Sequence, residues 1–197
     1  LKRSVYQQIA TDDQHVFNRY FTEAFCHPDR QEKNWNRTFE LHPEHPKGGV
    51  LLLHGLSDGP YSMRALAHMF HQQGYYVLVP RLPGHGTIPG MLKRATWKDL
   101  NMVNDESPIK PQKLFLFSPA IGITRFAAFS GLHRVLSFIP YFKKIAWESI
   151  APEYDPFKYN SFPKIAGHQL YQLTRLTQKK IDELHNNGKL ERLPPIQ

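Results

Sequence analysis

The stretch that most constrains the fold of this chain lies between residues 48 and 86, where a strand, a helix and a second strand follow one another. Val50–Leu53 is a continuous apolar run, which predicts a strand buried on both faces, as in a parallel sheet. Pro60 suits the first position of the next helix, apolar residues then recur at helical spacing, and Gly74 offers a stop. Tyr75–Val79 predicts the second strand.

A strand, a helix and a parallel strand form a right-handed crossover, the unit from which α/β folds are built. Sheets of this kind bind ligands at the carboxyl ends of their strands. The chain places His54–Leu56 after the first strand and Gly84–Gly86 after the second. We therefore look for a site where these two loops meet.

Three motifs surround these loops: HGLSDGPYSMR at His54–Arg64, RLPGHGT at Arg81–Thr87 and TWKD at Thr96–Asp99. Together they resemble the α/β-hydrolase superfamily, and within it the carboxylesterases and monoacylglycerol lipases. The resemblance is dense from about Gly49 to Leu100 and looser from Lys113 to Gln197. It implies an α/β-hydrolase fold, a mostly parallel, doubly wound sheet with an inserted helical cap. It is specific for the fold and much less so for the substrate.

The resemblance also implies a serine nucleophile on a strand-to-helix turn, a downstream acid, a histidine, and an oxyanion hole of two backbone N–H groups. One of the two donors falls on Leu56, the residue after the His-Gly pair. Because the backbone supplies this donor, the side chain need not be polar. His54 and Gly55 are expected to shape the loop, and His85 is expected to be structural and not the catalytic base.

The nucleophile is harder to place. The pattern G-x-S-x-G occurs once, at Gly55–Gly59, with Ser57 in its centre. An elbow serine sits at the apex of a turn from which the helix starts at once, whereas Pro60 predicts a later start. We interpret Ser57 as a loop hydroxyl that bonds nearby backbone and keep it as an alternative nucleophile.

The interval from Thr87 to Gln112 is too short for the family's elbow. In the family, a helix, a strand, the elbow and another helix precede the next strand, which we assign to Lys113–Phe117. A parallel crossover needs at least about ten to twelve residues, so the interval holds one crossover and not two. We therefore expect that a segment carrying the elbow is omitted near residues 100–106.

The C-terminal residues predict a second omission. Leu193–Gln197 resembles the approach to the strand whose exit carries the family's catalytic acid, and neither that exit nor the histidine follows. We expect that the sequence joins segments of a longer protein and that the serine, acid and histidine lie outside it. A shortened, inactive homologue and a damaged reading frame are the alternatives.

The remaining chain is expected to form three further regions around the core at 48–120. Residues 1–47 are a lead-in, with a helix over Tyr6–Phe25 and an edge strand within Asn34–Leu41. Residues 121–187 are a helical cap and a return helix, and residues 188–197 lead back, truncated, into the core.

Within the cap region, residues 121–147 are rich in Phe, Leu, Ile and Ala, and Glu148–Phe162 is expected to be a loop. A return helix is expected over Pro163–Asn187, with Ser161 as its cap and Gly188 as its end. By resemblance, the cap excludes water and supplies an apolar wall for an acyl chain. A packed hairpin without a ligand and a basic amphipathic helix on a membrane surface are the alternatives.

The composition limits the kinds of ligand and partner that the chain is expected to bind. The net charge of +8 permits attraction to anionic surfaces. The basic residues are spread along the chain and cluster only in short pairs, so no nucleic-acid partner is expected. The single cysteine, Cys26, is expected to be buried or half-buried, and it excludes an internal disulfide or a multi-cysteine zinc site. The histidines lack metal-ligand spacing. We expect no metal, no cofactor and a small-molecule ester as substrate; the sequence shows no signal peptide or membrane-spanning run, and it leaves the compartment and oligomeric state open.

Three functional hypotheses follow. The first is a serine esterase that acts on small lipidic esters or acylglycerols, with its triad outside these residues. The second is an inactive α/β-hydrolase-like binding or scaffold protein. The third is an enzyme that uses Ser57.

Overall fold

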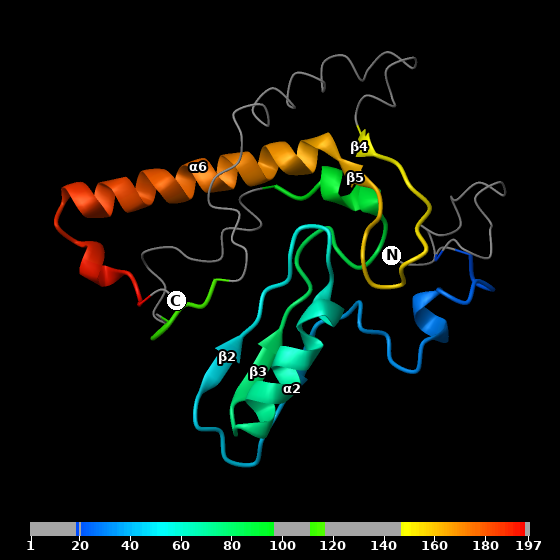
Figure 1. Cartoon of the computed structure of the whole chain (residues 1–197), viewed down its shortest axis with the longest axis horizontal. Helices are drawn as coiled ribbons and strands as arrows, with labels where there is room; N and C mark the ends of the chain where they lie inside the picture. The colour runs from blue at the N-terminus through cyan, green and yellow to red at the C-terminus, as the bar shows by residue number, and fades with distance from the viewer. Residues whose placement is uncertain (1–18, 20, 97–110, 117–146, 196–197) are drawn as a thin grey trace. The chain divides into compact units, whose positions relative to one another are not determined.

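The structure is a computed structural model that describes residues 19, 21–96, 111–116 and 147–195 (Figure 1). The chain divides into two compact units. The first unit combines Leu1–Arg94 with Trp147–Pro163, and the second combines Ala95–Ala146 with Lys164–Gln197. The four regions expected from the sequence stay a prediction.

A three-stranded sheet forms the centre of the first unit. Its strands lie in the order β1 (Phe39–Leu41), β3 (Tyr76–Val79) and β2 (Gly49–Leu51). β2 runs parallel to β3, and β1 pairs with the other side of β3 in the antiparallel direction. The predicted pair of parallel strands is confirmed, and so is the edge strand expected within Asn34–Leu41, in a shorter form.

The helix of the crossover, α2 (Arg64–Gln72), packs along β3 (Figure 1). A short 3₁₀ helix, η3 (Pro60–Met63), leads into it, with Gly59 as the N-cap and a proline at its first position. Ala67, Val77 and Val79 are fully buried and form the core, against which partly buried apolar residues of the strands and α2 pack. Gly74, with a φ of +85°, ends the helix as predicted.

One prediction for β2 is wrong: the strand is not buried on both faces. The side chains of Leu51 and Leu53 are 50% and 48% exposed. β2 lies at the edge of the sheet that the described residues form, and Val50 and Leu52 are residues that pack against the core. Because strand side chains alternate between faces, Leu51 and Leu53 turn toward the face that the described residues leave uncovered.

A hairpin in the first unit corrects the expectation that Glu148–Phe162 is only a loop. β4 (Trp147–Ser149) pairs antiparallel with β5 (Phe162–Pro163). A short 3₁₀ helix, η4 (Pro89–Lys93), packs against β5. The remaining residues, 150–161, connect the two strands, and they are called the hairpin loop below.

A buried ion pair joins the hairpin loop to the N-terminal segment. Arg19 is 1% exposed, and its Nη2 lies 3.5 Å from Oε2 of Glu153. The Arg19 guanidinium also donates to the carbonyl oxygens of Asp155 and Lys158 at 3.3 and 3.1 Å. Glu153 accepts a hydrogen bond of 2.7 Å from the Ser161 N–H. Both buried charges therefore have hydrogen bonds besides the ion pair. Such bonds offset the cost of removing the charges from water.

The helix predicted over Tyr6–Phe25 lies mostly outside the described residues, and its last part is not helical. Residues 21–26 form turns and bends, with hydrogen bonds such as that from the Ala24 N–H to the Phe21 carbonyl at 3.0 Å. A proline disfavours helical backbone in the residue before it, and His27 is extended, with ψ of 129°, ahead of η2 (Pro28–Arg30). Cys26 is buried, as predicted.

The second unit contains α6 (Lys164–Asn186) and a short 3₁₀ helix, η6 (Leu190–Arg192). Gly188, with a φ of +63°, follows the helix and confirms the predicted end. The predicted N-cap of this helix, Ser161, is wrong. Its hydroxyl instead bonds the backbone N–H and carbonyl of Ala151, each at 3.0 Å.

The strand predicted over Lys113–Phe117 is reduced, within residues 111–116, to one backbone bridge. The Leu114 N–H donates to the Pro195 carbonyl at 3.0 Å. This bond brings together two segments that the sequence analysis places before and after the expected cap. The apolar cap stretch up to residue 146 and the omission expected near residues 100–106 lie outside the described residues.

Replacing Glu153 with glutamine tests the buried ion pair. Glu153→Gln removes the counter-charge that lies 3.5 Å from the buried Arg19 guanidinium, and we expect it to lower the free energy of unfolding by about 3–5 kcal/mol. Glu183→Gln is the matched control, because Glu183 is 49% exposed and pairs with Lys179 at 3.8 Å on α6. Loss of that exposed pair should change the free energy by less than about 0.5 kcal/mol. Urea unfolding of both variants measures the difference, and equal effects would contradict the assignment.

Candidate functional site

Two loops of the first unit meet at a pair of buried histidines. The first, the His54 loop, comprises residues 54–59 and follows β2; the second, the His85 loop, comprises residues 82–87 and follows β3. His54 and His85 are 4% and 2% exposed, and their ring centroids lie 4.8 Å apart at an angle of 68°. The sequence prediction that these loops adjoin at the carboxyl ends of the parallel strands is confirmed.

His54 uses both ring nitrogens on the backbone. Its Nε2 accepts a hydrogen bond of 3.1 Å from the Leu82 N–H. Its Nδ1 lies 2.9 Å from the Gly55 carbonyl oxygen. Because Nε2 is the acceptor, Nδ1 carries the proton and donates to Gly55. Burial, with the neighbouring His85 ring as a smaller cause, lowers the pKa of His54 to about 4, so the ring is neutral at neutral pH.

The Gly55 carbonyl oxygen accepts a second hydrogen bond, from the Asp58 N–H at 3.1 Å. In a trans peptide the carbonyl and the following N–H point in opposite directions within one plane. With two donors holding the Gly55 oxygen, the Leu56 N–H is directed away from them. No acceptor for this N–H lies within the described part of the chain. The loop thus fixes the direction of one backbone donor that the described residues leave without an acceptor.

His85 supports the next peptide group. Its Nε2 lies 2.7 Å from the Leu56 carbonyl oxygen, and its Nδ1 lies 2.9 Å from the Pro83 carbonyl oxygen. The ring nitrogens of His54 and His85 thus all face backbone atoms, and neither ring is directed at a serine hydroxyl among the described residues. This geometry favours the structural role expected for His85.

The hairpin loop reaches both of these loops through Tyr159. Its backbone N–H donates to the Ser57 carbonyl at 2.8 Å. Its phenol donates to the Gly84 carbonyl at 2.9 Å and accepts from the Thr87 N–H at 3.0 Å. Sequence analysis missed Tyr159, because it belongs to no local motif and lies 75 residues from Gly84 along the chain.

Two glycines allow the backbone segments to approach. A Cβ on Gly59 would lie 2.8 Å from the Phe157 carbonyl oxygen, which belongs to the hairpin loop. A Cβ on Gly86, where φ is +67°, would lie 2.6 Å from the Asn36 carbonyl oxygen. Asn36 itself donates through its side chain to Pro156. The two glycines thus allow backbone contacts that larger residues would push apart.

Ser57 shows no sign of activation in the described residues. The structure places it in the His54 loop, where its carbonyl is bonded and its hydroxyl makes no hydrogen bond to a described group. The nearby Asp58 lies 3.9 Å from Nζ of Lys158, a pair that is half exposed. Among the described residues, Ser57 therefore has no hydrogen-bonded base of the kind that a nucleophilic serine uses.

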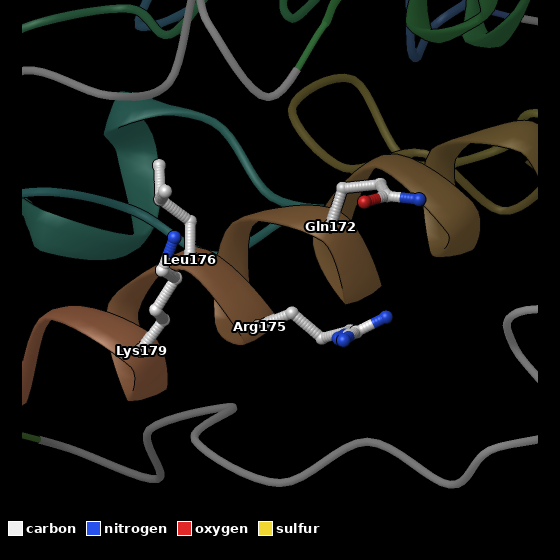
Figure 2. A pocket seen from close by; sticks show the side chains of 4 residues that line it. All are labelled: Gln172, Arg175, Leu176 and Lys179. Atoms are coloured by element: carbon white, nitrogen blue, oxygen red, sulfur yellow. The ribbon is translucent and has the colours of Figure 1, made fainter. Parts of the chain in front are cut away.

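Other features of the described residues do not compete as a site. Figure 2 shows a shallow depression on α6, in the second unit, lined by Gln172, Arg175, Leu176 and Lys179, with no nucleophile or acid among them. Across the described ranges, no three His, Cys, Asp or Glu side chains gather as metal ligands would. Among those same residues, no helix has the length and apolar character needed to cross a membrane.

Comparison with known proteins gives a relative over part of the sequence. No family model matches the chain. Over 51 residues the chain is 49% identical to the "Thermostable monoacylglycerol lipase" of Bacillus sp. (strain H-257). This match covers 26% of the chain, and the chain spans about a fifth of that relative, or 20% of its length.

Comparison with solved structures gives a chain from "LipS and LipT, two metagenome-derived lipolytic enzymes increase the diversity of known lipase and esterase families". The TM-score is 0.47 and the sequence identity 18%, over 83% of this chain and 84% of that one. Neither comparison identifies a serine nucleophile, an oxyanion hole or a cap.

The buried state of His54 predicts a pH dependence of stability. Its pKa is about 4 in the folded protein, against 6.5 for an unperturbed histidine. Because the unfolded chain binds the extra proton first, the contribution is complete above pH 6.5 and is lost as pH falls through 4, to a total of about 3 kcal/mol. Urea unfolding across this window should show the loss in the wild type and in His45→Gln, an exposed control. His54→Gln should flatten the slope, and an unchanged slope would refute the prediction.

Replacing Gly59 tests the close contact between the His54 loop and the hairpin loop. Gly59→Ala forces the Phe157 carbonyl to move and should lower the free energy of unfolding by about 1–3 kcal/mol. Gly49→Ala is the control, because a Cβ there meets nothing within 4 Å, and its effect should stay within about 0.5 kcal/mol. Thermal unfolding compares the two variants; equal melting temperatures would rule out the contact.

Proposed function

We propose that this chain is part of a serine hydrolase that has the α/β-hydrolase fold and cleaves carboxylic esters. Small lipidic esters or acylglycerols are the proposed substrates. The 49% identity to a monoacylglycerol lipase over 51 residues supports this class, and so do the parallel strands β2 and β3 with a loop site at their carboxyl ends. The complete doubly wound sheet and the helical cap belong to the same proposal.

In the proposed mechanism, a serine attacks the ester carbonyl after a histidine takes its proton. The carbonyl oxygen becomes negative in a tetrahedral intermediate, the alcohol leaves with a proton, and water then hydrolyses the acyl-enzyme. In this proposal, residues outside this sequence supply the serine, the acid and the histidine. The chain contributes the Leu56 N–H, which binds the negative oxygen; loss of one such donor typically lowers the rate by about 10²–10³.

The orientation of the Gly55–Leu56 peptide is the observation that carries this proposal. The Gly55 oxygen is held by His54 at 2.9 Å and by the Asp58 N–H at 3.1 Å, while the Leu56 N–H has no acceptor among the described residues. A donor held in advance needs no reorganisation when charge develops, which is the main source of oxyanion stabilisation. His54 and Gly55 are thus loop-shaping residues in the proposal, and the Leu56 backbone is the catalytic group.

An inactive binding protein with the same fold is the second candidate. The ring nitrogens of both nearby histidines face backbone atoms, which favours the binding protein over an enzyme that uses Ser57, because the described residues then supply Ser57 with no base. The two remaining candidates differ in whether a reactive serine exists elsewhere in the protein. A covalent serine probe therefore separates them.

Fluorophosphonate labelling tests the proposal on the protein expressed from its full open reading frame. We expect labelling of one serine other than Ser57, located by mass spectrometry, and hydrolysis of p-nitrophenyl butyrate that disappears with labelling. Ser57→Ala should keep both properties. Labelling at Ser57, or activity lost with Ser57→Ala, would support the Ser57 enzyme instead. A folded protein that neither labels nor hydrolyses esters would establish the inactive binding protein.

A further inference from the structure

We propose that Tyr159 is a positioning residue for the Leu56 N–H donor. This inference rests on the proposed hydrolase function and deepens it, because it assigns part of the site to the hairpin loop. Tyr159 contacts no reacting atom in this scheme. It acts through the backbone of the His54 and His85 loops, which it bonds from 2.8 to 3.0 Å.

The first connection runs through the backbone of Tyr159. Its N–H holds the Ser57 carbonyl at 2.8 Å, and that carbonyl shares a planar peptide with the Asp58 N–H. The Asp58 N–H in turn donates to the Gly55 oxygen at 3.1 Å, whose peptide carries the Leu56 N–H. Two hydrogen bonds and two rigid peptide planes therefore link Tyr159 to the orientation of the donor.

The second connection runs through the phenol. The Tyr159 hydroxyl bridges the Gly84 carbonyl and the Thr87 N–H, at 2.9 and 3.0 Å, on either side of His85. The Tyr159 ring also lies nearly parallel to that of His85, with centroids 6.1 Å apart at 17°. His85 then holds the Leu56 carbonyl at 2.7 Å. The phenol thereby fixes the His85 loop. From this loop, His85 contacts the Leu56 carbonyl, which belongs to the peptide group after the Leu56 N–H donor.

The surroundings keep Tyr159 in this position and in its protonated form. The residue is 4% exposed, and Cζ of Arg19 lies 4.7 Å from its ring centroid. Burial raises the pKa of Tyr159, so its hydroxyl keeps the proton that it donates to Gly84. The ion pair between Arg19 and Glu153, at 3.5 Å, fixes the guanidinium over the ring.

Tyr159→Phe removes both bonds of the phenol and keeps the ring. Tyr154→Phe is the matched control, because Tyr154 lies in the same hairpin loop and is 58% exposed. In the full-length protein we expect Tyr159→Phe to lower kcat by about 10-fold with KM unchanged, a fraction of what loss of a whole donor costs. The Ki of an alkyl trifluoromethyl ketone, which forms a tetrahedral oxyanion, should rise by the same factor. Tyr154→Phe should match the wild type in both measurements.

A purely structural role would change melting temperature without separating kcat from KM, so both variants are assayed well below their melting temperatures. Hydrogen exchange gives a readout without catalysis: the peptide covering residues 54–60 should exchange faster in Tyr159→Phe only. Should Tyr159→Phe fail to fold, 4-fluorophenylalanine in place of Tyr159 fills the space of the hydroxyl without donating.

The outcomes separate the two proposals. Activity in the wild type with equal kcat, Ki and exchange in the two variants overturns the role of Tyr159 and leaves the hydrolase standing. Absence of both labelling and hydrolysis in the wild type overturns the hydrolase and with it the role in catalysis. A loss of kcat in Tyr159→Phe alone, together with weaker binding of the ketone inhibitor and faster hydrogen exchange of residues 54–60, establishes Tyr159 as the positioning residue.

Discussion

The planarity of one peptide group governs this site. Because the Gly55 carbonyl is held by a histidine and by a backbone amide, the N–H on the other side of the same plane has a set direction before any ligand arrives. Other features of the first unit stabilise this orientation of the Gly55–Leu56 peptide. Burial keeps His54 neutral and so preserves the acceptor that binds Leu82. Gly59 and Gly86 allow other backbone segments close enough to hold the loops from outside.

Much of the three-stranded sheet and of α2 in the first unit was predictable from local sequence patterns. The apolar runs located β2 and β3, Pro60 located the start of the helical turn, and Gly74 located the end of α2. The error at β2 has a physical cause. A run of apolar residues indicates that a strand can be buried on both faces, but exposure depends on what covers it, and in the described residues Leu51 and Leu53 are uncovered.

The residues that hold the two loops of the site in place were much less predictable from the sequence. His54 and Leu56 stood out because they follow a strand in a known motif, whereas Arg19, Glu153 and Tyr159 belong to no such motif. Their roles depend on contacts across 68 to 139 residues of chain, which no helical or strand period encodes. The hairpin of β4 and β5 escaped detection for a similar reason, since its two short strands, Trp147–Ser149 and Phe162–Pro163, carry little pattern of their own.

The reach of Arg19 has a kinetic consequence. Its guanidinium binds the carbonyl of Lys158, 139 residues further along the chain, and so closes a very long loop. The entropy of such a closure must be overcome before the contact contributes any stability, so pairings distant in sequence form slowly. We therefore expect the crossover of β2, α2 and β3, whose partners are near one another in sequence, to form before the contacts of Arg19. The local hydrogen bonds at Gly55 then come first, and the bonds of the hairpin loop add to them later.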